Sequence, residues 1–283
     1  MSSLAPGALE PKTRDRADNP VVLVTGASSG IGEGIARRFA VGQFRVVVVA
    51  RRRDSLERLA SDLSGVTEVE VVAADVRTKG AAERSVSAAM DAFGRLDCLV
   101  NNAGAGRWGR VGETDDEMLD EVIETSLEAP FRFSRAALAV MRSGSSIINI
   151  GSTFGILGGL RAGAYCMAKA GLIGLTQAIA VDYGAKGIRA NLVAPGVIKT
   201  EMTQGSWGAE WFRRANQEMT PLDRDGTVED VANLVFFLAS SQGSYIQGQT
   251  IALDGGWTTT RFLSREALTC ERAQHPRPRG LEE

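Results

Sequence analysis

Near its N-terminus the chain reads Val21-Val-Leu-Val-Thr-Gly-Ala-Ser-Ser-Gly-Ile-Gly32, an apolar run followed by three closely spaced glycines. The β-branched residues of the run predict a buried strand, and the residues from Ile31 onward have helical spacing. Gly26, Gly30 and Gly32 allow a tight turn that a phosphate group can approach closely. The first N–H groups of the helix then face that phosphate. The segment therefore predicts a strand–turn–helix unit that binds a dinucleotide.

The same alternation of apolar runs and helical stretches continues along the chain. The runs are apolar on both faces, as parallel strands must be when helices cover both sides of their sheet. We predict an α/β fold with a Rossmann-type, doubly wound, parallel seven-stranded sheet and helices on both faces. The strands are expected at 20–25, 45–50, 68–73, 96–101, 146–150, 188–193 and 250–253, and the helices at 31–41, 55–63, 81–93, 115–141, 162–184 and 228–240.

Three of the expected helices have a capping residue at their start, followed three positions later by an acidic residue that can bond back to it. These pairs are Asp54 with Glu57, Thr114 with Glu117, and Thr227 with Asp230.

Composition and charge indicate a globular chain with one domain. The 283 residues are 44% hydrophobic and 23% charged, which suits one large α/β domain. We expect a flexible leader at 1–19, a single dinucleotide-binding and catalytic domain at 20–257, and a tail at 258–283. The net charge of −2 gives no reason to expect a nucleic-acid partner. No apolar run reaches the roughly 20 residues of a membrane span, so no membrane is expected as a partner either.

Cysteine and histidine are scarce in this chain. Cys98, Cys166 and Cys270 are too few and too scattered for a disulfide framework or a metal cluster. The single histidine, His275, lies in the tail, which leaves no histidine-based triad and no zinc site. We therefore expect no metal and a cytoplasmic location.

The second expected strand ends in Arg51, Arg52 and Arg53 rather than in an acid. An acid at this position holds the ribose 2′-hydroxyl of NAD, whereas a guanidinium group suits the 2′-phosphate of NADP. Ser28 in the glycine turn can add a hydrogen bond. Arg52 and Arg53 have the alternative interpretation of a solvated helix start, and Arg51 is favoured as the phosphate ligand. The expected cofactor is NADP(H).

Further cofactor contacts are expected where the next strands end, because ligands of such sheets bind at the carboxyl edge. Asp75 follows the third strand, where an acid can meet the adenine amino group. Asn101-Asn-Ala-Gly104 follows the fourth. Gly104 permits close contact with the adenosine, and Asn101 is better explained as a residue that links strands.

Tyr165, Lys169 and Ser152 form a candidate catalytic group. Tyr165 and Lys169 lie four positions apart in an expected helix, and Ser152 ends the strand before it, so the three can converge. A nearby ammonium group favours the phenolate and moves the tyrosine towards acid–base chemistry near neutral pH. Ser152 can bond to the substrate oxygen as charge develops there. A Tyr-x-x-x-Lys pair is mostly structural when it stands alone, and its order after the glycine turn gives it weight here.

These motifs resemble the short-chain dehydrogenase/reductase family over about residues 20–257. The resemblance implies an NADP-dependent oxidoreductase that acts on CH–OH groups and interconverts a ketone and a secondary alcohol. It implies that Tyr165 is the acid–base, that Ser152 binds the substrate oxygen, and that Lys169 binds the nicotinamide ribose and tunes Tyr165. The matching elements are Thr25-Gly-Ala-Ser-Ser-Gly-Ile-Gly32, Asp75, Asn101-Asn-Ala-Gly104, Ser152, Tyr165-Cys-Met-Ala-Lys169, the segment 191–196 and Asp254-Gly-Gly256.

The resemblance also completes the expected cofactor site. Pro195, Gly196 and Val197 would flank the nicotinamide, and Val197 and Thr200 would contact its carboxamide or phosphate side. The full expected set is Gly26, Ser28, Ser29, Gly30, Ile31, Gly32, Arg51, Arg52, Asp75, Val76, Asn102, Ala103, Gly104, Tyr165, Lys169, Pro195, Gly196, Val197 and Thr200.

One position departs from the family pattern. Members usually carry a catalytic asparagine in the helix after Asn-Asn-Ala-Gly, which supports a water that relays protons to the lysine. Here the stretch reads Ile123-Glu-Thr-Ser-Leu127, so Ser126 takes that place. Serine keeps the main-chain carbonyl but loses the amide, and we expect a working but slower relay.

The general pattern is similar to 3-oxoacyl-carrier-protein reductases, through Thr220-Pro-Leu-Asp-Arg224 and Tyr245-Ile-Gln-Gly-Gln249. The expected substrate is a small carbonyl or alcohol compound, either free or bound to an acyl carrier. Two groups of residues bear on this. Apolar pocket walls or ordinary packing can explain Trp207, Trp211, Phe212, Trp108, Phe154 and Leu157, and a docking patch or ordinary solvation can explain Arg132, Arg135 and Arg142.

The resemblance implies a homo-oligomer, a tetramer or a dimer, formed through the helices at 115–141 and 162–184 and through the last strand. A catalytically idle NADP-binding regulator on the same fold is the alternative function. That alternative predicts loss of Ser152, Tyr165 or Lys169, and all three are present. A sheet protein for another nucleotide is disfavoured because the Gly-Lys-Ser/Thr phosphate loop is missing.

Overall fold

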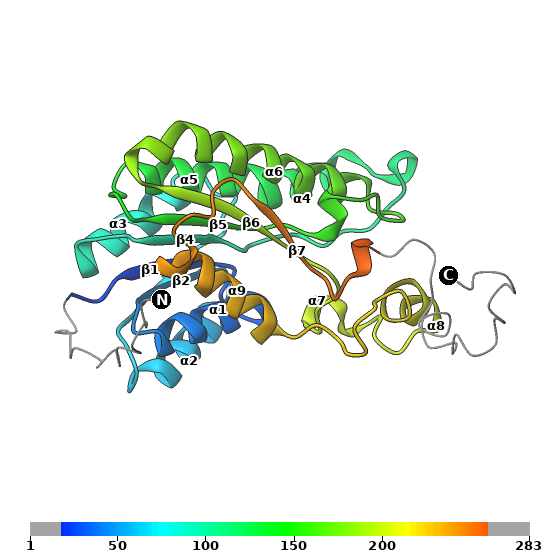
Figure 1. Ribbon diagram of the computed structural model, residues 1–283, viewed down its shortest axis with the longest axis horizontal. Coiled ribbons are helices and arrows are strands. Elements are labelled where there is room, and N and C mark those ends of the chain that lie inside the picture. Colours follow the sequence, from blue (N-terminus) through cyan, green and yellow to red (C-terminus); the bar gives the residue numbers. More distant parts are fainter. Residues whose placement is uncertain (1–17, 260–283) are drawn as a thin grey trace, which may run out of the picture.

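The computed structural model describes residues 18–259 as a parallel seven-stranded sheet between two helical layers (Figure 1). The strand order is β3-β2-β1-β4-β5-β6-β7, so the chain returns to the centre of the sheet between β3 and β4. This confirms the doubly wound Rossmann-type fold. The strands are β1 (Val21–Thr25), β2 (Arg45–Ala50), β3 (Val69–Ala73), β4 (Cys98–Asn101), β5 (Ser146–Ile150), β6 (Arg189–Pro195) and β7 (Thr250–Leu253).

Helices cover both faces of the sheet (Figure 1). One face is covered by α1 (Gly30–Val41), α2 (Arg53–Leu63) and α9 (Val228–Ala239), and the other by α3 (Ala81–Phe93), α4 (Asp116–Ile123), α5 (Ala129–Leu138) and α6 (Gly163–Tyr183). Successive strand residues point to opposite faces. Val22 therefore packs with Ile35 of α1, whereas Leu23 packs in the cluster that contains Phe133 of α5. The inner strands β1, β2, β4, β5 and β6 are buried on both faces, which explains their apolar runs, whereas the edge strands β3 and β7 are partly exposed.

The helix starts follow the expected capping residues in one of three cases. Thr227 caps α9 and forms a reciprocal capping box with Asp230, as predicted. The prediction for Asp54 is wrong, because α2 begins at Arg53, two residues earlier than expected, and has no side-chain cap. The prediction for Thr114 is wrong by one residue, since Asp115 is the cap and accepts a hydrogen bond from the Met118 N–H at 2.8 Å.

The helix expected at 115–141 is interrupted. A π-helical turn at Glu124–Glu128 separates α4 from α5, which ends at Leu138. Pro130 lies in the first turn of α5 and has no N–H to donate, which removes one bond of a continuous helix. Isolated π turns in helices often occur at functional sites, and this one contains Ser126.

The segment Gly163–Lys186 is long and apolar enough to cross a membrane, judged by length and composition alone. In its most apolar window 39% is buried, and α6 packs against β6 and α4. Core helices of soluble proteins share this composition, so the feature by itself is weak evidence for a membrane.

Candidate active site

The glycine turn lies at the carboxyl end of β1, where the order of the strands reverses between β1 and β4. Gly26 and Gly30 have φ angles of +68° and +56°, which favour glycine. A Cβ at Gly26 would lie 2.9 Å from the Ala103 Cα, and one at Gly32 would lie 2.3 Å from the Gly26 carbonyl oxygen. Ser29 begins α1 without a side-chain capping bond, so the first N–H groups are available to a phosphate.

The end of β4 is fixed against this turn. The Asn102 amide donates to the carbonyl oxygens of Thr25 at 2.9 Å and Gly26 at 3.2 Å. The hydroxyl of Thr25 accepts hydrogen bonds from the N–H groups of Asn102 and Ala103. Ile31 packs against the core on the α1 side. The expected residues on β1 and β4 therefore lie together at one edge of the sheet.

Asn101 has the structural role expected for it. Its side-chain amide donates to the Asn149 side-chain oxygen at 2.8 Å and to the Ser134 hydroxyl at 3.1 Å. The Asn149 amide in turn donates to the Thr176 hydroxyl at 2.8 Å. This buried chain of hydrogen bonds ties β4 and β5 to α5 and α6.

Arg52 lies beside the glycine turn. Its guanidinium group donates to the Ser29 hydroxyl at 2.6 Å and to the Ser28 hydroxyl at 3.2 Å. It also forms an ion pair at 3.3 Å with Glu201, at the start of α7 (Glu201–Gln204). Arg53 points elsewhere and pairs with Glu57 on its own helix. Of the three arginines, Arg52 has the closest contacts with the turn.

Arg51 and Asp75 lie near each other at the ends of β2 and β3. The pKa of the Asp75 carboxyl is lowered, chiefly because Arg77 donates hydrogen bonds to it, and the charge of Arg51 adds to the effect. Asp75 therefore stays ionised near neutral pH and retains its capacity to accept hydrogen bonds. Val76, the next residue, is buried.

The structure brings Ser152, Tyr165 and Lys169 together at the carboxyl edge of the sheet. Ser152 follows β5 and forms a hydrogen bond with the Tyr165 hydroxyl. The Lys169 Nζ lies 5.6 Å from the centre of the Tyr165 ring. Lys169 is buried and donates to the Ile150 carbonyl oxygen at 2.8 Å. A Cβ at Gly104 would lie 3.5 Å from this Nζ, an ordinary contact distance, so the loop after β4 lies beside the lysine.

Burial is the main influence on the pKa values of Tyr165 and Lys169. It raises the pKa of Tyr165, and the hydrogen bond from Ser152 opposes the rise only in part. It lowers the pKa of Lys169 to about 8. The expected lowering of the Tyr165 pKa by Lys169 is therefore absent from this structure. The phenol rests protonated, and the lysine remains predominantly charged at pH 7.

Ser126 is fully buried in the π turn between α4 and α5. Its hydroxyl accepts a hydrogen bond from the Ala105 N–H at 3.1 Å. The same hydroxyl would lie 3.6 Å from a Cβ at Gly104. Ser126 therefore supports the loop after β4 beside Lys169.

The segment after β6 reaches back to the glycine turn. Pro195 ends β6, and the Gly196 N–H donates to the Leu253 carbonyl oxygen at 3.0 Å. Thr200 caps α7, and its Cβ lies 3.4 Å from the position of a Cβ at Gly30. Val197 lies between these two points and is partly buried. The expected residues of this segment thus line the far side of the same edge.

Aromatic side chains surround Tyr165. The Trp108 ring lies 5.2 Å from the Tyr165 ring and 6.1 Å from that of Phe154, which lies 6.1 Å from Trp257. Trp108 is 46% exposed. Trp257 is absent from the sequence-based site, although the turn Asp254-Gly-Gly256 directly before it provides a signal. These rings form an apolar wall beside the phenol.

Three of the aromatic residues considered as pocket walls pack on one another. Trp207 and Trp211 both contact Phe212 at 5.6 Å between ring centres. Lys199 lies over the Trp207 ring, and Trp211 is 64% exposed. For these residues the contacts therefore agree with the packing alternative.

Two of the arginines considered as a docking patch are engaged in ion pairs. Arg132 pairs with Glu128 and donates to the Arg77 carbonyl oxygen. Arg135 pairs with Glu83. These contacts agree with the alternative of solvated, paired charge on a helix.

Comparison with known proteins agrees with this geometry. Residues 26–258 match the family profile described as "Enoyl-(Acyl carrier protein) reductase". The chain belongs to the short-chain dehydrogenase/reductase family. A relative in Chlamydia muridarum, the 3-oxoacyl-(acyl-carrier-protein) reductase FabG, is 37% identical over 84% of this chain and 97% of the relative. Meso-2,3-butanediol dehydrogenase of Serratia marcescens is 35% identical over 87% and 97%.

A solved short-chain dehydrogenase has the same fold. The Burkholderia cenocepacia enzyme, in complex with NADP, superposes with a TM-score of 0.80 at 30% identity and covers 86% of this chain and 100% of its own. As a short-chain dehydrogenase/reductase, the protein is an oxidoreductase of a family that acts on alcohol and ketone substrates.

Proposed function

We propose that the protein is an NADP(H)-dependent oxidoreductase that interconverts a ketone and a secondary alcohol with Tyr165 as the acid–base. The observation that carries this proposal is the meeting of Ser152, Tyr165 and Lys169 at the sheet edge. The glycine turn lies at the same edge. Proton transfer and dinucleotide binding are thereby placed side by side.

The residues present fit a dinucleotide with a 2′-phosphate. Gly26 and Gly32 leave no room for side chains, as a close backbone approach to a pyrophosphate requires. Arg52 and Ser28 offer donors suited to the 2′-phosphate, with Arg51 nearby. Asp75 would meet the adenine, and Thr200 would lie on the phosphate side. The bound cofactor would supply or accept a hydride.

Tyr165 moves the proton in this mechanism. Its raised pKa keeps the phenol protonated at rest, which suits donation to a substrate oxygen during reduction. The Ser152 hydroxyl binds the same oxygen and stabilises the charge that develops there. The Lys169 ammonium, close to the ring, stabilises the phenolate left behind. Ser126 holds the neighbouring loop and takes the place of the usual asparagine.

We propose a substrate whose carbonyl group is joined to apolar groups. The wall of Trp108, Phe154 and Trp257 beside Tyr165 supports this choice. Aromatic walls with a few polar groups are typical of pockets for small apolar ligands. Cyclic ketones and acyl thioesters, whether free or bound to an acyl carrier, both fit this description.

The test is a screen for NADPH oxidation with acyl thioesters, cyclic ketones and sugars. We expect turnover with an apolar ketone and a loss of at least about a hundredfold in Tyr165→Phe, because general acid catalysis contributes about 10²–10⁴-fold. NADPH binding without turnover on the whole panel would instead favour an idle regulator. Equal kcat/KM with NADH and NADPH would contradict the cofactor preference.

We also propose that the protein is a homo-oligomer, a dimer or a tetramer, in the cytoplasm. The outer side of α5 and α6 exposes Phe131, Met167 and Val181, which are 53%, 52% and 81% exposed. Apolar residues gathered on one face are typical of interfaces between proteins. A small number of scattered cysteines fits a reducing compartment.

A further inference from the structure

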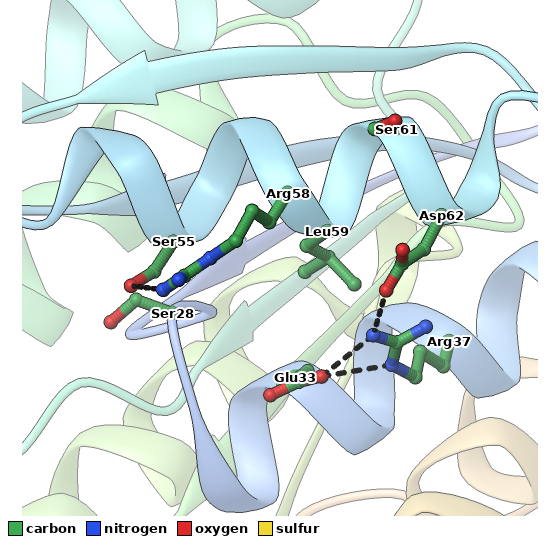
Figure 2. Close-up of a pocket in the computed structure, with 8 residues that line it drawn as sticks. All are labelled: Ser28, Glu33, Arg37, Ser55, Arg58, Leu59, Ser61 and Asp62. Atoms are coloured by element: carbon green, nitrogen blue, oxygen red, sulfur yellow. Dashed lines mark hydrogen bonds and ion pairs between the residues drawn. The ribbon is translucent and has the colours of Figure 1, made fainter.

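A cavity of about 290 Å³ lies between α1 and α2, next to the glycine turn (Figure 2). Ser28 of the turn lines it on one side, and Ser55 and Arg58 of α2 line it on the other. The opposite end is formed by an ion-pair cluster in which Arg37 binds both Glu33 and Asp62. That cluster holds one positive and two negative charges, a net charge of −1.

Arg58 points towards the turn. Figure 2 shows its side chain running along α2 towards Ser55 and Ser28, with the guanidinium group beside Ser55. Its Nη2 donates to the Ser55 hydroxyl at 3.1 Å. No carboxylate within the described residues 18–259 forms an ion pair with it, whereas its neighbours Arg37 and Arg53 are paired. Arg58 therefore brings uncompensated positive charge to a surface lined by hydroxyl groups.

Arg52 contacts the same serine. Its Nε and Nη2 both lie 3.2 Å from the Ser28 hydroxyl oxygen. The Ser28 hydroxyl thus accepts from Arg52 and lines the same cavity as Arg58, and Ser55 adds a second hydroxyl. A phosphate monoester carries nearly two negative charges and three acceptor oxygens. One guanidinium fork binds two of these oxygens, so a second arginine suits the third oxygen and the remaining charge.

We infer that Arg58 and Ser55, together with Arg52, form part of the site for the 2′-phosphate of the cofactor. This inference rests on the proposed use of NADP(H). The carboxylate of Glu201 already occupies part of the Arg52 guanidinium. Arg58 is free of such competition within the described residues. It is therefore a specificity-determining residue, which strengthens binding of nucleotides that carry the 2′-phosphate and leaves other nucleotides unaffected.

The test compares adenosine 2′,5′-bisphosphate with adenosine 5′-monophosphate by isothermal titration calorimetry, so that no substrate is needed. Arg58→Gln should weaken binding of the bisphosphate about tenfold, the size expected for one charge-assisted hydrogen bond. Its affinity for the monophosphate should stay within about twofold. Ser55→Ala should weaken the bisphosphate by a smaller factor. Thermal unfolding of each variant checks that the fold is intact.

Arg53→Gln is the matched control, because Arg53 lies on the same helix and pairs with Glu57. Arg53→Gln should change neither affinity. The inference is overturned when Arg58→Gln behaves like this control while the unmodified protein still prefers the bisphosphate. Equal binding of both nucleotides by the unmodified protein would instead show that the proposed NADP preference is wrong, and the inference would fall with it.

Discussion

Lys169 carries an ammonium group into the interior, where its surface is only 4% exposed. Burial lowers its pKa from 10.5 to about 8. A lowered lysine pKa means that the native state binds the proton less tightly than the unfolded chain, so the charge costs stability at neutral pH. That cost disappears as the pH rises from about 8 towards 10.5, where the unfolded chain also loses the proton. The positive charge of Lys169 is thus kept in a buried environment that favours the neutral amine.

We expect Lys169→Met to abolish activity and to stabilise the fold. The gain at pH 7 should be about 1–2 kcal/mol, since relief of the buried charge is partly offset by the loss of the hydrogen bond to the Ile150 carbonyl oxygen. Denaturant unfolding at pH 7 and pH 9.5 measures this. The advantage of the variant should shrink at pH 9.5, and an advantage independent of pH would contradict the explanation.

Ser126 has a different task from that of the asparagine it replaces. Because its hydroxyl accepts the Ala105 N–H, Ser126→Ala should leave that donor without its partner and cost about 1–2 kcal/mol of stability. The loop beside Lys169 should loosen, so the KM for NADPH should rise. Unfolding curves and steady-state kinetics measure the two effects.

Ser126→Asn tests the proton relay directly. We expect a rise in kcat if the missing amide slows the relay. An unchanged kcat, in a variant that folds normally, would show that the amide has no part in turnover.

Individual residues show where sequence reasoning ends. Spacing alone brought Tyr165 and Lys169 together with Ser152, because helix periodicity and the carboxyl edge of a sheet fix such positions. Spacing did not predict Arg58 or Trp257 as residues of the site. A long arginine can extend along its helix in several directions, and an aromatic residue after the last strand has no periodic pattern to reveal its neighbours.

At the scale of elements, α7 is tied to the turn after β2 by one ion pair. Glu201 stands at the start of α7, and its partner Arg52 contacts the glycine turn. The two residues are 149 positions apart in the sequence. A carboxylate here competes with any phosphate for the same guanidinium group. The pair is exposed, with 51% and 63% of the two side chains accessible, so its own contribution to stability is small.

Glu201→Gln should therefore strengthen NADPH binding about three- to tenfold and leave NADH unchanged, because only the 2′-phosphate gains from the freed arginine. Fluorescence titration with the two nucleotides measures this. Glu210→Gln is a suitable control, since Glu210 pairs with Arg214 in the same segment and away from Arg52. Equal changes with both nucleotides would point to a general shift of α7 instead.

The elements themselves were predictable to different degrees. All seven strands were expected, because apolar runs of β-branched residues have few alternatives in an α/β chain. The interruption at Glu124–Glu128 was not, since the helical spacing of apolar residues continues through it. Asp54 and Thr114 show that a capping motif specifies a helix start only to within one or two residues.

At the scale of the whole molecule, the exposed face of α5 and α6 bears on assembly. Val181 on this face should lie in an interface if the protein is an oligomer. Val181→Asp would then bury a charge without a partner and should shift the assembly towards monomers. Light scattering after size-exclusion chromatography gives the mass.

Val66→Asp is the matched control, because Val66 is also exposed, at 50%, but lies in the turn after α2. This control should leave the mass unchanged. A monomeric mass for the unmodified protein would contradict the proposal that it is an oligomer. If the unmodified protein and Val181→Asp form oligomers of equal mass, the interface does not include Val181.

The strand order reverses between β1 and β4. Along the chain, this point separates most of the proposed nucleotide-binding residues from the proposed catalytic residues. Most of what is proposed to meet the adenosine lies on β1 to β3 and their helices, with Gly104 shortly after β4, whereas Ser152, Tyr165 and the aromatic wall come later in the chain. Recombination within this family can then exchange the two parts separately. A chimera that takes residues 20–101 from an NAD-dependent relative should inherit the donor's nucleotide and retain the substrate of this protein, with the ion pair between Arg52 and Glu201 among the contacts that cross the junction.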